Sequence, residues 1–83
     1  MAFPWEKKKT LTVDLHQMTT SEAKQWLTMK VTAAPKNTEE IEVIHGYRGG
    51  TALGQMVRKS FRHPRVRSVV LGLNPGTTIL ILK

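Results

Sequence analysis

The sequence predicts an α/β domain with two layers, and three observations support this prediction. Apolar and polar residues alternate across residues 11–16, which is the pattern of a strand with one buried face. Apolar residues recur at helical spacing in residues 20–34 and again in residues 52–62. Three more apolar runs have the length of strands, and they span residues 41–44, 66–71 and 77–82. The predicted element order is therefore β-α-β-α-β-β.

The first helix has sequence signals at both ends. Thr19 followed by Glu22 has the spacing of a capping box, so we expect the helix to begin near Thr20. Pro35 cannot continue a helix and should end it. The stripe of side chains that we expect to be buried consists of Ala23, Trp26, Leu27, Val31 and Ala34.

The second helix is expected to run from about Ala52 to Arg62. It should end there because His63 precedes Pro64, and a residue before proline is disfavoured in the helical region. The face that we expect to be buried consists of Leu53, Met56, Val57, Ser60 and Phe61.

The order of the strands in the sheet follows from the last strand. It carries Ile79 and Ile81 on one face and Leu80 and Leu82 on the other, so both of its faces should be buried inside the sheet. Right-handed crossovers place both helices on one face if the first three strands step in one direction. The sequence therefore predicts a four-stranded mixed sheet in the order 1-2-4-3, with the fourth strand antiparallel and two helices on one face.

Length, composition and charge predict one small domain, residues 10–83, after a basic tail, residues 1–9. The chain has no cysteine, which excludes disulfides and thiolate zinc sites. It contains neither a long apolar run nor the apolar core of a signal peptide, so we expect a cytoplasmic protein without membrane contact. Thirteen lysines and arginines against six aspartates and glutamates give a net charge of +7. This excess favours DNA or RNA as a partner, with simple solubility as the alternative.

Three candidate catalytic residues should meet at one edge of this sheet. Because Asp14 and His16 alternate with the buried residues of the first strand, they should project from its open face, next to His45 at the end of the parallel second strand. One histidine can act as general base and the other as general acid in phosphodiester cleavage. Asp14 can orient His16 or hold a divalent cation, for which Mg²⁺ and Mn²⁺ are the candidates. The alternative is that Asp14 and His16 are structural polar residues at a strand end.

A glycine-rich loop follows His45 and leads into the second helix. It has neither the Lys-Ser/Thr of a Walker A loop nor the spacing of a dinucleotide fingerprint. Free N–H groups before a helix can still bind a phosphate, and a tight turn is the alternative explanation for the glycines. Arg48 would add a planar donor, and Tyr47 could stack on a base. The candidate phosphate-binding residues are Gly46, Tyr47, Arg48, Gly49, Gly50 and Thr51.

A second basic group lies in and after the second helix and consists of Arg58, Lys59, Arg62, Arg65 and Arg67. Arg58 and Arg62 are one turn apart on the predicted solvent face, so they could bind a nucleic-acid strand that wraps around the sheet edge. The alternative is that these cations complement the negative end of the helix dipole.

The stretches Val13-Asp14-Leu15-His16 and Val43-Ile44-His45-Gly46, with their order and spacing, resemble the small MutS-related (Smr) domain family over residues 10–83. Asp14 and His16 match the family's L-D-x-H motif, with Val13 in place of leucine. His45 and Gly46 match the start of its H-G-x-G-x-G loop, and Arg48 stands where the second glycine is expected.

The resemblance implies a two-layer fold like the C-terminal domain of a bacterial translation initiation factor. It also implies binding of DNA or RNA, and several members of the family nick DNA or cleave RNA. Many such domains are parts of larger proteins related to mismatch repair or associated with the ribosome. We therefore expect a nucleic-acid-binding domain with endonuclease activity. A non-catalytic module for RNA, DNA or the ribosome is the first alternative. A protein-interaction domain that uses the open sheet face is the second.

Overall fold

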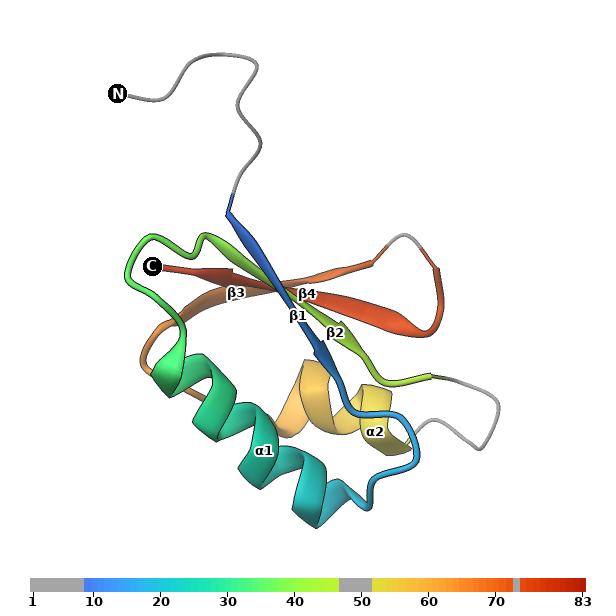
Figure 1. Ribbon diagram of the computed structural model, residues 1–83. Helices are drawn as coiled ribbons and strands as arrows, with labels where there is room; N and C mark the ends of the chain where they lie inside the picture. The colour runs from blue at the N-terminus through green and yellow to red at the C-terminus, as the bar shows by residue number, and fades with distance from the viewer. Residues whose placement is uncertain (1–8, 47–51, 73) are drawn as a thin grey trace.

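A computed structural model describes residues 9–46, 52–72 and 74–83. Within these ranges the chain forms a four-stranded sheet and a helical layer that covers one face of it (Figure 1). The elements in chain order are β1 (Thr10–Asp14), α1 (Thr20–Ala33), β2 (Glu40–Ile44), α2 (Ala52–Gln55), a π-helical turn (Met56–Ser60), β3 (Val66–Leu71) and β4 (Thr77–Leu82).

The strand order is β1-β2-β4-β3, which confirms the predicted topology. β1 and β2 are parallel, and β4 is antiparallel to both of its neighbours, β2 and β3. Four of the six residues of β4 are buried, as expected for a strand inside the sheet. Both helices lie on the same face (Figure 1), so the described residues leave the opposite face of the sheet uncovered. Val70 and Leu71 on the edge strand β3 are 45% and 72% exposed.

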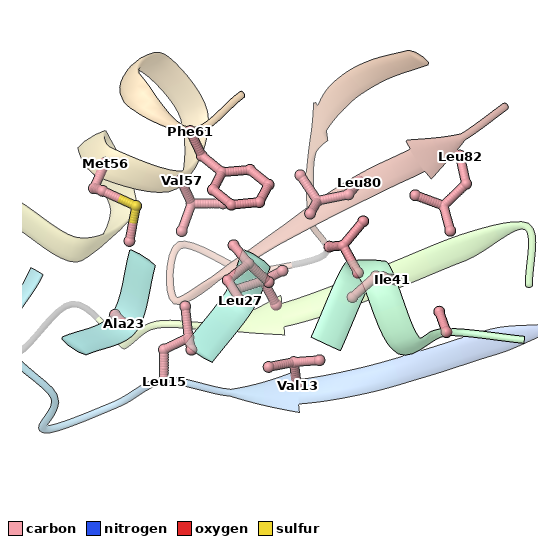
Figure 2. Close-up of a cluster of buried hydrophobic side chains, with 13 residues drawn as sticks. Val13, Leu15, Ala23, Leu27, Ile41, Met56, Val57, Phe61, Leu80 and Leu82 are labelled. Carbon is pink, nitrogen blue, oxygen red and sulfur yellow. The ribbon is translucent and has the colours of Figure 1, made fainter. Parts of the chain in front are cut away.

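The core lies between the sheet and the helices (Figure 2). Leu15 directly after β1, Leu27 in α1 and Val57 in the π-helical turn are completely buried there. The stripe expected for α1 is largely confirmed, because Ala23, Leu27, Val31 and Ala34 are all buried; Trp26 is half-buried, and the Lys30 ammonium lies 4.5 Å from the centre of its ring.

α1 begins with the predicted capping box. The Thr19 hydroxyl accepts a hydrogen bond from the Glu22 backbone N–H at 3.1 Å, and the Glu22 carboxylate accepts one from the Thr19 N–H at 3.1 Å. Two backbone N–H groups that the helix cannot satisfy therefore have partners. The cap also fixes the direction in which the chain leaves the turn between β1 and α1.

Thr19→Ala should lower the free energy of unfolding by about 1 kcal/mol, because the Glu22 N–H loses its partner. For a domain of this size the expected fall in Tm is about 4–8 °C. Thermal denaturation followed by circular dichroism measures it. Thr20→Ala, one residue further on and already inside the helix, is the matched control and should leave Tm nearly unchanged. Equal losses in the two variants would contradict the role of the cap.

The second helix is shorter and wider than predicted. It was expected to reach Arg62 as one α-helix, but its last five residues, Met56–Ser60, form a π-helical turn. The Phe61 N–H donates to the Met56 carbonyl at 2.7 Å, which closes this wider turn before the chain becomes extended. The extra residue in the turn carries Phe61 into the core and leaves Ser60 exposed, so the prediction that Ser60 faces the core is wrong.

Arg65 caps the C-terminus of α1 instead of facing a ligand. Its guanidinium donates to the carbonyl oxygens of Val31 at 2.8 Å, Ala34 at 2.7 Å and Pro35 at 3.2 Å. A helix leaves its last carbonyls without internal partners, and one planar cation satisfies three acceptors here. Arg65, a member of the second basic group, therefore has a structural role at the end of α1.

Candidate functional site

The carboxyl ends of β1 and β2 meet at one end of the sheet. Asp14 is the register partner of Ile44, and the Leu15 N–H donates to the Ile44 carbonyl at 2.7 Å. The turn before β4 joins them, since the Gly76 carbonyl accepts from the N–H groups of His45 and Gly46 at 2.9 and 3.0 Å. Three segments that are distant in sequence therefore converge beside His16 and His45.

Asp14 and His16 form a hydrogen-bonded pair at this end. The Asp14 Oδ1 atom accepts from the His16 backbone N–H at 3.0 Å and is also bonded to the His16 ring Nδ1. An ionised carboxylate only accepts hydrogen bonds, so Nδ1 carries a proton, and the Nε2 of a neutral ring is then an acceptor. The two side chains are 50% and 55% exposed, and no described residue occupies Nε2. The pair thus presents an oriented basic nitrogen to solvent.

The Asp14 carboxyl should titrate below its ordinary pKa of 3.8, mainly because the His16 ring and then the His16 backbone N–H donate to it. A depressed folded-state pKa stabilises the fold above 3.8, and that contribution disappears as the pH falls through the lower folded value. An NMR titration of the Asp14 side-chain carboxyl carbon measures this pKa. In His16→Ala it should rise toward its ordinary value but not fully reach it, since the backbone donor persists. An identical pKa in both proteins would contradict the assigned cause.

His45 is close to His16 but has a different environment. It is only 4% exposed, its Nδ1 lies 2.9 Å from the Gly46 carbonyl, and its Nε2 lies 2.8 Å from the Thr78 hydroxyl on β4. A carbonyl can only accept, so Nδ1 donates and Nε2 accepts from Thr78 in the neutral ring. Both nitrogens are therefore bonded within the protein. His45 ties the start of the glycine loop to β4.

Two glycines fit this arrangement closely. Gly46 has a φ of +74°, which is the left-handed region that glycine adopts without strain. Gly54 of α2 faces the His45 ring, and a Cβ placed there would lie 3.0 Å from that ring. The absence of a side chain at Gly54 lets α2 approach the buried histidine. Gln17 next to His16 also has a left-handed φ, +69°, without being glycine.

A cavity of about 940 Å³ opens beside the pair. Its wall includes His16, the residues that lead into α1, the end of β2, the start of α2 and the turn before β4. Met18, Ile44 and Leu53 give it an apolar side. The contribution of Asn74 and Thr77 was missed in the sequence, although the predicted order 1-2-4-3 already placed the start of β4 next to the end of β2.

The Smr domain of MutS2 from Thermus thermophilus, known from a crystal structure, is similar to this chain in structure, with a TM-score of 0.64. The two sequences are 26% identical, and the match covers 88% of this chain and 98% of the other. This chain is an Smr-like domain. The resemblance based on the two short motifs is thereby confirmed. No protein-family model and no curated protein matches the sequence.

The two basic residues predicted on the second helix, Arg58 and Arg62, lie outside the cavity wall. Arg58 is half-buried and donates to the Gly54 carbonyl at 3.1 Å, and a Cβ at Gly54 would meet both the Arg58 guanidinium and the His45 ring. Arg62 is exposed and donates to the Phe61 carbonyl at 3.0 Å. Neither arginine lines the cavity. Their contact with nucleic acid stays a prediction.

The predicted phosphate-binding loop starts at the cavity. Gly46 lines the cavity, as expected for the first residue of that loop. The remaining candidates, Tyr47, Arg48, Gly49, Gly50 and Thr51, lie outside the described residues.

The sequence brought Mg²⁺ and Mn²⁺ into consideration as ions that Asp14 could hold. Over residues 9–46, 52–72 and 74–83 there is no group of three or more histidines, cysteines, aspartates or glutamates that could hold an ion. Asp14 and His16 are bonded to each other.

In the same part of the chain, no helix is long and apolar enough to cross a membrane.

Proposed function

We propose that this Smr-like domain binds DNA or RNA at the cavity and cleaves a phosphodiester bond with His16 as general base. The observation that carries the proposal is the Asp14–His16 pair, in which a carboxylate holds the Nδ1 proton and leaves Nε2 exposed as an acceptor. This arrangement gives an imidazole the tautomer and orientation of a general base. Asp14 acts as a positioning residue through His16.

In the proposed reaction, His16 Nε2 takes the proton of a water molecule or of a ribose 2′-hydroxyl. The oxygen attacks phosphorus, the new P–O bond forms, the opposite P–O bond breaks, and the leaving oxygen takes a proton from solvent. Asp14 stabilises the imidazolium that forms on His16. Our proposal uses this pair and takes no step through a metal ion.

Two further features favour an anionic substrate. The chain carries a net charge of +7, which attracts polyanions at moderate ionic strength. The N-terminus of α1 also opens on the cavity, where Thr19 and Thr20 line the wall. The Glu22 carboxylate and the Thr19 hydroxyl satisfy two of the donors at this helix end. A helix N-terminus also carries the positive end of the helix dipole, which favours an anion nearby.

The proposal is tested by incubating the purified protein with supercoiled plasmid and with structured RNA, each with and without Mg²⁺ or Mn²⁺. Nicked plasmid or shortened RNA should appear with the native protein and not with His16→Ala. Equal cleavage by both proteins would indicate a contaminating nuclease and overturn the proposal. Binding measured in parallel should weaken with salt, with a log–log slope of about −3 to −5 for ~4–6 phosphate contacts.

A non-catalytic module that binds RNA, DNA or a ribosomal surface is the second candidate. It is favoured by one observation: both ring nitrogens of His45 are bonded inside the protein, so the described residues offer a base but no free histidine as proton donor for the leaving oxygen. Under this alternative, salt-dependent binding is retained and neither substrate is cleaved. The same gel and binding measurements separate the two candidates.

A further inference from the structure

The cavity beside His16 has an apolar wall, which a bound phosphate alone would not need. A phosphate needs hydrogen-bond donors, and the start of α1, where a helix has free N–H groups, lines the cavity next to His16. The side chains of Met18, Ile44 and Leu53 form an apolar wall that offers a phosphate nothing. A volume of about 940 Å³ with apolar walls and a few polar groups is the ordinary form of a site for a small organic group.

Three polar side chains on the cavity wall could read the edge of a planar ring. Asn74 is fixed because its Oδ1 accepts from the Gly76 N–H at 2.9 Å, and within the described residues its amide nitrogen keeps both donors free. Gln17 places a second amide on the wall, and no hydrogen bond from a described residue engages it. Glu42 adds a carboxylate, which repels a phosphate but accepts hydrogen bonds from an amino group.

We propose that this cavity holds an unpaired nucleobase while its phosphate lies at His16, so that the substrate is single-stranded or looped nucleic acid. The inference rests on the proposed function and names its substrate class. Met18, Ile44 and Leu53 pack against the base, and the amides of Gln17 and Asn74 bond its edge. A base in a regular duplex is stacked and paired, and it must leave the helix before it can enter such a cavity.

The test compares strands that carry the same phosphates with and without bases. Fluorescence anisotropy of the whole chain, at one ionic strength, is measured with a single-stranded DNA of about 12 nucleotides, with an abasic strand of the same length, and with a duplex of the intact strand. The intact single strand should bind at least tenfold more tightly than the abasic strand and more tightly than the duplex.

The possible results separate this inference from the proposed function. Equal binding of intact and abasic strands would overturn the base site and leave phosphate binding intact. Tighter binding of the duplex would also overturn it. Absence of binding to every strand, and to RNA strands of the same design, would overturn both the inference and the proposed function.

Variants of the cavity residues test whether the tighter binding of the intact strand comes from the cavity. Asn74→Asp keeps the acceptor that the Gly76 N–H needs but removes the two free donors, and Gln17→Ala removes the second amide. Both variants should reduce the ratio of the affinities for the intact and the abasic strand at least threefold. Leu53→Ser should reduce this ratio as well, because it makes the apolar wall polar. Met29→Ser is the matched control, because Met29 is 51% exposed on α1 and lies outside the cavity. If the control reduced this affinity ratio equally, the assignment of base binding to the cavity would be overturned.

Discussion

His16→Ala is expected to reduce nucleic-acid cleavage by about 10²–10⁴-fold, because the alanine removes the only nitrogen that we assign as general base. His16 is 55% exposed, so the variant should keep the fold and the binding affinity. Single-turnover cleavage assays, with circular dichroism as a check on folding, measure the effect. A variant that binds as well as the native protein and also cleaves as fast would refute the catalytic role of His16.

Asp14→Asn should give a similar loss for a different reason. The asparagine amide can donate to Nδ1 and so favours the tautomer in which Nε2 carries the proton and cannot act as a base. We expect kcat to fall while KM stays within about twofold, because Asp14 acts through His16 and does not contact the substrate. His63→Ala is the matched control, since the His63 ring contacts Thr32 and Arg65 at the other end of α1. A rise in KM alone would contradict a positioning role.

Arg65→Met is expected to cause the largest loss of stability among the exposed or half-buried arginines, about 3 kcal/mol in the free energy of unfolding. The methionine keeps much of the packing but removes every donor from the carbonyls of Val31, Ala34 and Pro35, and bonds from a charged donor contribute about 1.5–3 kcal/mol. The corresponding fall in Tm is ~12–24 °C for a domain of this size. Urea denaturation monitored by tryptophan fluorescence gives the free energy directly.

Arg62→Met is the matched control for this prediction. Arg62 is exposed, and its one hydrogen bond among the described residues is to the carbonyl of its neighbour Phe61, so its loss should change stability by less than about 0.5 kcal/mol. The loss of stability in Arg65→Lys should lie between those of the two methionine variants, because an ammonium cannot reach three acceptors with the geometry of a planar guanidinium. If Arg62→Met and Arg65→Met lost the same stability, a general effect of charge would explain both.

The fold could be predicted from the sequence because each signal lies within a few consecutive residues or within a single helix or strand. The Thr19–Glu22 capping box lies within four consecutive residues, and the apolar character of both faces of β4 needs no knowledge of its neighbours. The apolar character of β4, with the handedness of crossovers, was sufficient for the order β1-β2-β4-β3. The family resemblance came from two short motifs and is supported by the structural similarity.

The features that could not be predicted depend on partners distant in the chain. The Thr78 hydroxyl that bonds His45 is 33 residues away, and the carbonyls that Arg65 caps are 30 to 34 residues away. Sequence spacing placed His16 and His45 at one edge but could not show that one is exposed and the other buried. The π-helical turn before Phe61 gives no signal in the helical periodicity of residues 52–62, because it changes the phase only at the helix end.

The Arg65 cap also has a consequence for how the domain folds. The last turn of α1 obtains its donors from a residue at the start of the β3 segment, so that turn gains this stabilisation only after α2 and the chain beyond it have been brought back across the sheet. In the transition state for folding, the first turn of α1 can already be formed, since its cap is local, whereas the last turn should be frayed. The helix would thus acquire its two ends at different times.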